Sequence, residues 1–527
     1  MISIRYHRQS VWAVALTLVM TFQILLVSAL ADDNVAQGTK SENAKAQEAT
    51  AGDSAARDKK AEACTKDIVA ARALYKSIPT DFRDLKEPVE KITARVHECK
   101  TLLDRFRANC GNNLKGNEDV YPMLVRMMVA LSAQERQNLR DAGLERDDVQ
   151  ARMMEYYGRV TELCEEFRAV APKEHPLQAH VIRQTGDAHY FRQEYDLAIE
   201  RYQRVQKEFP KYDDTSSVLL GNLRCYVNTQ NPQDGITFAR KLIKKQYRQS
   251  DLPHYYEMLW KLLIMAGKLE DLVKLTEEVA RIFPVRQMRE GASHRERDMY
   301  TRYIGYNGFR RGYSQFALGS VGDSLDSFNA HVNSMKSKRG ELEKAGRSLF
   351  PELEVFDKRS RSNIRFLQER YGEIPKVGLE NIVWASGEPQ NLGSDQKAPL
   401  GILFRNINDR RSAKFLQALD RHSSEHPDLY RFVVLSFGRP NIDPRIVADE
   451  GIGELNELAV HSASFGIDPD ARTGQDNFFH ACQAMVGSAT FAVIDGEGRM
   501  RWWQQDPRDM DVNFSTAILE RIALDSK

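Results

Sequence analysis

The stretch GDAHYFRQEYDLAIERYQRVQKEFP, residues 186–210, decides the fold of the middle of the chain. Within it, Gly186, Ala198, Tyr202 and Pro210 are spaced by 12, 4 and 8 residues. A glycine on one helix and an alanine early on the next allow two antiparallel helices to approach closely, and the aromatic ring fills the gap beside them. Proline then ends the second helix. The spacing therefore predicts a helical hairpin.

The same spacing resembles a tetratricopeptide repeat, whose motif places glycine, alanine, an aromatic residue and proline at these intervals. His189 departs from it, because the motif usually has tyrosine there. Pro210 and Pro284 lie about two repeat periods apart, and residues 322–328 give a further weak match. The resemblance implies three to five helical hairpins over residues 173–335. The alternative is a generic helical bundle with a chance match.

The N-terminus has the three parts of an export signal. Arg5 and Arg8 precede an apolar stretch at 11–27, and Ala-Leu-Ala follows at 29–31. We expect residues 1–31 to be a cleaved signal peptide, which makes the protein periplasmic or extracellular. An uncleaved membrane anchor is the alternative, because the apolar stretch is long for a signal. Residues 32–60 contain one Val and no aromatic residue, so we predict a disordered linker.

Length and charge set the remaining organisation. A chain of 527 residues exceeds one hydrophobic core. Its 75 basic and 74 acidic residues balance, which argues against nucleic acid or an acidic lipid surface as a partner. Residues 61–172 carry apolar residues at helical spacing and are predicted to be a helical domain, and the charge-rich residues 336–372 are predicted to be connecting helices. No membrane span is expected after the signal.

Short apolar runs replace the helical pattern after Pro375. Strands are predicted at 400–404, 432–437, 490–494 and 500–503. Helical patterns lie at 412–422, around residue 482 and at 512–524, so the predicted order is β-α-β-α-β-β-α. We expect an α/β domain over residues 373–527.

Residues 382–392, followed by 398–404, resemble the opening of envelope thioredoxin-like oxidoreductases of the TlpA type. Residues 487–502 are similar to the third and fourth strands of that family. The resemblance implies a thioredoxin-like domain. The predicted fold class is thus an all-α array of tetratricopeptide-like helical hairpins followed by an α/β thioredoxin-like domain.

The redox motif of that family is missing. Aligned on the resemblance, the two redox cysteines would fall at Asp409 and Ser412, and the cis-proline of the fold at Ala489. Cys482 is the only cysteine after Cys225. Dithiol exchange needs a thiolate at a helix N-terminus and a second, resolving thiol. The sequence therefore excludes this activity.

Two interpretations of the former redox site stay open. Asp409 at the start of a helix is expected to be an N-cap. The functional alternative is an anion-binding site formed by Arg405, Arg410 and Arg411. We expect Cys482, on a predicted helix, to be a buried inert thiol, and a reactive single cysteine is the alternative.

The other cysteines lie earlier in the chain. Cys64 and Cys99 fall on two predicted helices joined by a turn at 78–80, which predicts a Cys64–Cys99 disulfide and leaves Cys110–Cys164 as a second pair. Buried free thiols are the alternative.

One zinc motif occurs, since His422-Ser-Ser-Glu425-His426 matches H-x-x-E-H. Pro427 follows at once, so the second histidine should lie at or beyond the helix end. No third ligand is evident on a later helix. We therefore expect no metal and no cofactor.

These observations predict an exported bacterial protein-binding or scaffold protein with a redox-inactive thioredoxin-like domain. Protein or peptide partners are expected, because stacked helical hairpins form extended concave surfaces. The alternative from the enzyme class is a single-cysteine thiol-disulfide oxidoreductase of the cell envelope that uses Cys482. A third alternative is a structural role in envelope assembly.

Overall fold

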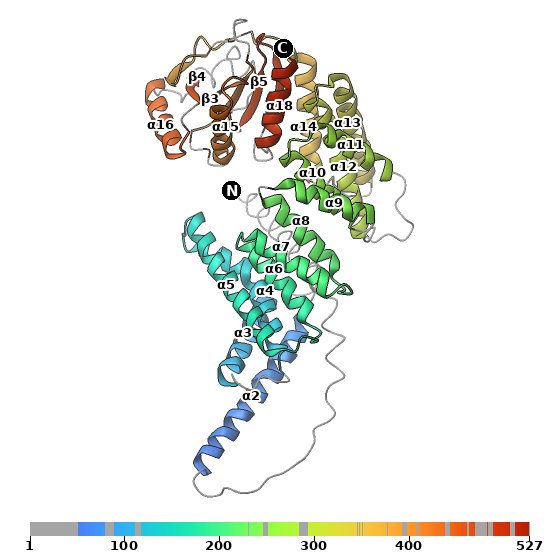
Figure 1. The fold of residues 1–527 in the computed structure, drawn as a ribbon, viewed down its shortest axis with the longest axis vertical. Coiled ribbons are helices and arrows are strands. Elements are labelled where there is room, and N and C mark those ends of the chain that lie inside the picture. The colour runs from blue at the N-terminus through green and yellow to red at the C-terminus, as the bar shows by residue number, and fades with distance from the viewer. Residues whose placement is uncertain are drawn as a thin grey trace. The chain divides into compact units, whose positions relative to one another are not determined.

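The chain forms two compact units in the computed structural model (Figure 1), and they divide between residues 230 and 231. This division falls inside the segment 173–335 that the sequence groups as one array. The structure describes residues 51–78, 89–110, 117–229, 231–245, 251–283, 294–344, 346, 348–349, 351–376, 378–390, 392, 398–407, 409, 412–437, 443–460, 463–468, 482, 489–505 and 512–525. The predicted signal peptide lies outside these residues.

The first unit consists of consecutive helices, each packed against the next. The described residues of the segment 61–172 are largely helical, as predicted, but the first helix begins at Ala51, inside the predicted disordered linker. Three of residues 51–60 are alanine, the residue with the highest helix propensity, and the sequence prediction gave this too little weight. The helices are α2 (Ala51–Ser77), α3 (Val89–Cys110), α4 (Val120–Asp141), α5 (Arg146–Val170), α6 (Gln178–Phe191), α7 (Tyr195–Glu208) and α8 (Thr215–Asn228).

Tyr202 is the centre of the predicted hairpin of α6 and α7. Its ring is 1% exposed, and a Cβ atom added at Gly186 of α6 would lie 2.9 Å from its Cε1. A Cβ at Gly221 of α8 would lie 2.6 Å from its Cζ. Only glycine leaves room for the ring on both sides. Ala198 is completely buried, as the spacing predicts for close helix approach.

A disulfide joins Cys64 of α2 to Cys110 of α3, with Cα atoms 6.2 Å apart. The predicted pairs Cys64–Cys99 and Cys110–Cys164 are therefore wrong, and Cys99 and Cys164 are buried free thiols. The reason is the length of the connection. Helix α2 ends at Ser77 and α3 begins only at Val89, so Cys99 lies opposite Ala71, whose carbonyl accepts a hydrogen bond from the thiol at 3.4 Å.

The second unit begins with a further run of packed helices. On α12, Gly305, Gly308 and Gly312 lie along one face, and a Cβ atom at any of them would come within 2.8 Å of a side chain on α13 or α14. This glycine face allows the three helices to pack closely. The helices are α9 (Pro232–Lys245), α10 (Leu252–Met265), α11 (Leu269–Ile282), α12 (His294–Ala317), α13 (Val321–Lys344) and α14 (Pro351–Glu369).

A six-stranded mixed sheet follows, in the order β1-β4-β3-β2-β5-β6. Strand β2 pairs in parallel with β3 and antiparallel with β5, and β6 is antiparallel to β5. The elements are β1 (Val383–Ser386), β2 (Leu400–Arg405), α15 (Ala413–Glu425), β3 (Arg431–Phe437), α16 (Pro444–Glu457), β4 (Ser464–Asp468), β5 (Thr490–Ile494), β6 (Met500–Gln505) and α18 (Val512–Asp525). The α/β domain is confirmed.

The four predicted strands are present, but the predicted order of elements omits β1 and, between β3 and β5, the strand β4. This strand lies parallel to β3, and β1 is antiparallel to it. It begins with Ser464, ends with Asp468 and has Gly466 at its centre, so only two large apolar residues mark it in the sequence.

Helices and sheet share one core in the second unit. The rings of Trp502 on β6 and Phe316 on α12 have centroids 4.3 Å apart, while Trp503 stacks on Phe366 of α14 at 6.0 Å. Successive side chains of a strand point to opposite faces, so the helices reach both faces of β6. The Gly372 amide also donates to the Met500 carbonyl at 2.8 Å.

Among the described residues, no helix is long and apolar enough to cross a membrane.

The disulfide can be tested by chemical mapping. With the chain denatured but not reduced, we expect four reactive thiols and a cross-linked peptide that contains Cys64 and Cys110. Because the bond closes a loop between residues 46 apart, Cys64→Ser should lower the free energy of unfolding of the first unit by about 2–4 kcal/mol in urea titrations.

The double variant Cys64→Ser/Cys110→Ser is the control and should lose no more stability than the single variant. A cross-linked Cys64–Cys99 peptide would contradict the assignment.

Candidate functional site

The segment where the resemblance would place a redox motif lies between β2 and α15. Arg405, at the end of β2, is 2% exposed, and its Nη2 donates to the Asp409 carbonyl at 3.0 Å and to Glu454 Oε1 of α16 at 2.8 Å. A protein carboxylate thus already neutralises the guanidinium. The structure gives no support to Arg405 as part of an anion site, and Arg410 and Arg411 lie outside the described residues.

Asp409 does not occupy the predicted N-cap position. Helix α15 begins at Ala413, and Ser412 is its N-cap residue. Between them, the Ser412 amide donates to the Asp409 carbonyl at 3.2 Å, which forms a turn before the helix. Asp409 therefore lies three residues before the N-cap residue Ser412, in the turn that precedes the helix.

Ala489 and Cys482 are both buried, at 4% and 0% exposure. Cys482 lies in a turn rather than on the predicted helix. Its immediate neighbours lie outside the described residues. Burial raises the pKa of its thiol strongly, although the charge of Arg370 lowers it in part. A buried thiol with a raised pKa is a poor nucleophile.

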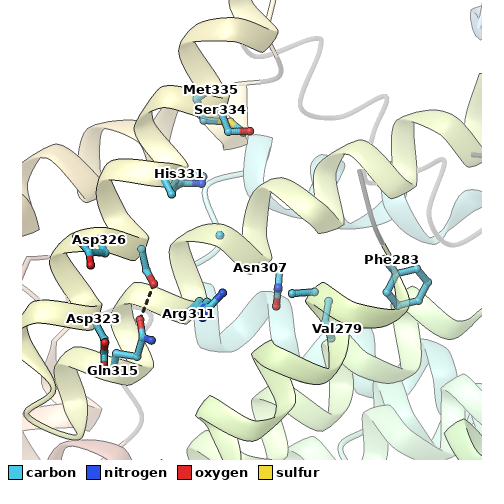
Figure 2. Close-up of a pocket in the computed structure, with 14 residues that line it drawn as sticks. Val279, Phe283, Asn307, Arg311, Gln315, Asp323, Asp326, His331, Ser334 and Met335 are labelled. Atoms are coloured by element: carbon cyan, nitrogen blue, oxygen red, sulfur yellow. Dashed lines mark hydrogen bonds between the residues drawn. The ribbon is translucent and has the colours of Figure 1, made fainter. Parts of the chain in front are cut away.

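A pocket of about 470 Å³ opens between α11, α12 and α13 (Figure 2). Figure 2 shows Asn307, Arg311 and Gln315 of α12 along the pocket, with Gln315 close to Asp323 of α13 and Asn307 next to Val279 of α11. The spacing of four residues places these three on one helix face. The Gln315 side chain is hydrogen-bonded to Ser327 Oγ at 2.6 Å, while the Asn307 amide donates to the Thr276 carbonyl at 3.1 Å.

His331 is the most buried ionisable residue of this pocket. It is 3% exposed, and its Nε2 atom is buried with no hydrogen-bond partner among the described residues. Burial lowers the pKa of His331 to about 4, although Asp357 opposes this. The ring is therefore neutral at pH 7.

A second pocket, of about 370 Å³, lies in the first unit and is lined by residues of α4 to α8. Aromatic side chains form much of its wall, namely Tyr157, Tyr190, Phe191 and Tyr202. Asp187 lies between them and accepts hydrogen bonds from the Tyr202 hydroxyl at 2.7 Å and from Arg183 Nη1 at 2.8 Å.

Unpaired polar groups distinguish this second pocket. Gln184 is 2% exposed, and neither its amide nitrogen nor its amide oxygen has a hydrogen-bond partner among the described residues. Arg183 Nη2 is likewise buried without a partner. Buried polar atoms are normally paired, and each unpaired one costs about 1–3 kcal/mol. A group that enters the pocket can satisfy them.

The structure places the side chains of the H-x-x-E-H segment near one another at the end of α15. The predicted position of His426 is confirmed, because α15 ends at Glu425 and His426 has φ −133° and ψ 54°. The ligand atoms of His422, Glu425 and His426 nevertheless lie within 4.8 Å of one another. Glu520 Oε1 of α18 lies 3.6 Å from His422 Nε2 but is not one of these mutually close ligand atoms.

Sequence reasoning missed both pockets. Gln184 and His331 each stand among other polar residues of their helices, and polar residues of a helix normally mark its solvent face. Gln184 and His331 are buried only because a neighbouring helix covers them, and the sequence does not show which helix that is. The only available signal was their proximity to Gly186 and to the glycine face of α12.

No protein-family model matches this chain, and a search of curated proteins finds no similar sequence.

His331 makes the stability of the second unit depend on pH. Its pKa is lowered in the folded chain, so the unfolded chain binds the extra proton between about pH 4 and pH 6.5. Stability should therefore rise with pH across this window, by up to about 3 kcal/mol. Tryptophan fluorescence during urea unfolding reports it, because four of the five Trp residues lie in this unit.

His331→Leu should flatten this pH dependence, whereas the exposed-residue control His97→Leu should keep it. Equal slopes for the native chain and His331→Leu would show that His331 is not the responsible group.

Proposed function

We propose that this chain is an exported, non-catalytic protein-binding or scaffold protein, in which a tetratricopeptide-like helical array binds polypeptide and a thioredoxin-like domain has no redox activity. The observation that carries the proposal is the pocket in the first unit. It combines aromatic walls with a buried, unpaired amide at Gln184.

A polypeptide can supply the hydrogen-bond partners that the buried polar groups of this pocket lack. The amide of Gln184 needs both a donor and an acceptor, and a peptide group supplies one of each. The rings of Tyr157, Tyr190 and Phe191 offer apolar surface for a partner side chain. Asp187 already holds Arg183 and Tyr202 in place, so the wall is preorganised before a partner arrives.

The tetratricopeptide-like assignment is supported by the packing of Tyr202 against Gly186 and Gly221. A repeat unit cannot bury its apolar face alone, so each helical hairpin needs a neighbour. The contact with Gly221 comes from the following helix α8, as stacking of repeats requires.

The thioredoxin-like assignment is supported by strand order. Four strands lie in the order β3-β2-β5-β6, in which β2 is parallel to β3 and antiparallel to β5, and β6 is antiparallel to β5. With α15 and α18 they form the β-α-β and β-β-α segments expected of that fold. In this interpretation, α16 with β4 is an addition after β3.

Export is supported by the Cys64–Cys110 disulfide, because disulfides persist in oxidising compartments. The three-part N-terminal signal points the same way. The rival enzyme that uses Cys482 is disfavoured by the complete burial of that thiol and by its raised pKa.

Substitution of Gln184 tests peptide binding. Peptides selected from a displayed random library on the purified native chain should bind Gln184→Leu about 10-fold more weakly, because hydrogen bonds to the amide are lost. The same substitution should raise the free energy of unfolding by about 1–2 kcal/mol, because it removes an unpaired buried amide. Fluorescence polarisation and urea titration measure the two effects.

Gln203→Leu on the exposed face of α7 is the matched control and should leave the affinity unchanged. Failure to select any peptide, or equal affinities of the native chain and Gln184→Leu, would reject the proposed pocket function.

The reactivity of Cys482 separates the scaffold from the oxidoreductase. In the native chain, we expect iodoacetamide to leave Cys482 unmodified while it consumes an equimolar model thiol, because the buried thiol stays protonated. The chain should not catalyse insulin reduction by dithiothreitol, with an active thioredoxin as the positive control. Catalysis of insulin reduction by the native chain that is lost in Cys482→Ala would contradict the scaffold proposal.

A further inference from the structure

The end of α15 and the facing side of α18 carry a cluster of metal-binding side chains that the proposed function does not use. His422 and Glu425 come from α15, His426 follows it directly, and Glu520 comes from α18. Two imidazoles and two carboxylates are a donor set that zinc prefers, with nitrogen and oxygen ligands at about 2.0–2.2 Å.

The distances within the cluster approach those of a bound ion. In a tetrahedral site, ligand atoms lie about 3.4 Å from one another when the metal bonds are about 2.1 Å long. His422 Nε2 and Glu520 Oε1 are 3.6 Å apart. The ligand atoms of His422, Glu425 and His426 all lie within 4.8 Å of one another. Since Glu425 and His426 are exposed, their side chains are free to close the remaining distance by rotation.

The backbone at His426 contributes to this geometry. Pro427 disfavours the helical conformation for the residue before it, and His426 leaves the helix accordingly. Its amide still donates to the His422 carbonyl at 3.1 Å, so the two histidines stay adjacent. Their ring centroids are 4.6 Å apart.

Two buried polar atoms at the cluster lack hydrogen bonds. His422 Nε2 is buried and has no hydrogen-bond partner among the described residues, since Glu520 lies beyond hydrogen-bond distance. The hydroxyl of Tyr430, a residue that is 1% exposed, is also buried without a partner. The Tyr430 ring packs 5.5 Å from the His422 ring. An ion on Nε2 would satisfy the first atom.

We infer that His422, Glu425 and His426 form a zinc-binding site, and that the half-exposed side chain of Glu520 rotates to join it, so that the site fastens the C-terminal end of α15 to α18. Water completes the coordination on the exposed side. The site stabilises the fold by linking His422 and Glu520, which are 98 residues apart in the sequence. It uses none of the residues of the peptide pocket in the first unit, so either can fail without the other.

Zinc titration of the purified full chain, stripped with a chelator, tests the inference. We expect one zinc ion per chain by isothermal titration calorimetry, and a higher melting temperature with zinc than with chelator. His422→Ala and His426→Ala should each weaken binding by at least about 10-fold and abolish the rise in melting temperature, whereas Glu520→Gln should have a smaller effect.

Two controls keep the result interpretable. His97→Ala removes an exposed histidine of α3 and should bind zinc like the native chain. Because His426 is exposed, His426→Ala should melt at the native temperature in chelator, which shows that it folds. Cobalt substitution should give the visible absorption of a tetrahedral ion in the native chain and not in His426→Ala.

Absence of zinc binding tighter than about 0.1 mM would overturn the site. Uptake that is equal in the native chain and in the double variant His422→Ala/His426→Ala would overturn it as well.

Discussion

The burial of Trp502 is the constraint on which the second unit depends. Its indole is completely buried against Phe316 of α12 and lies near Phe514 of α18. A tryptophan buries about 150–250 Å² of surface, which makes it one of the largest single contributions to a core. Because the neighbouring Trp503 packs on α14 from the other face, β6 is enclosed by helices that precede the sheet in sequence. Helices α12 and α14 therefore share a core with the sheet.

Much of this architecture could be predicted from local patterns. The spacing of Gly186, Ala198 and Tyr202 predicted the α6–α7 hairpin because a close helix contact requires small residues at fixed positions. The four apolar runs after Pro375 predicted strands for a different reason. A strand that is buried on both faces has apolar side chains in succession. Strand β4 escaped detection because its neighbours β1 and β3, rather than its own composition, hold it in the sheet.

The functional features were less predictable, because they depend on which helices become neighbours. Gln184 and His331 are ordinary polar residues in the sequence and become unusual only when packing seals them. The predicted disulfide pairing was wrong because it assumed a short turn at residues 78–80, whereas α3 begins only at Val89. Glu520 could not be associated with His422 from sequence, since their proximity arises from the packing of the last helix against α15.

The Cys64–Cys110 disulfide has a consequence for resistance to proteolysis. It joins two points 46 residues apart in the sequence, so the segment between them belongs to a covalent ring. A protease that cuts the backbone once anywhere within this ring leaves both fragments attached to each other, and the helices α2 and α3 stay together as a pair. A chain cut once in this ring therefore stays a single covalent molecule in the presence of proteases. Only a second cut in the same ring releases a fragment.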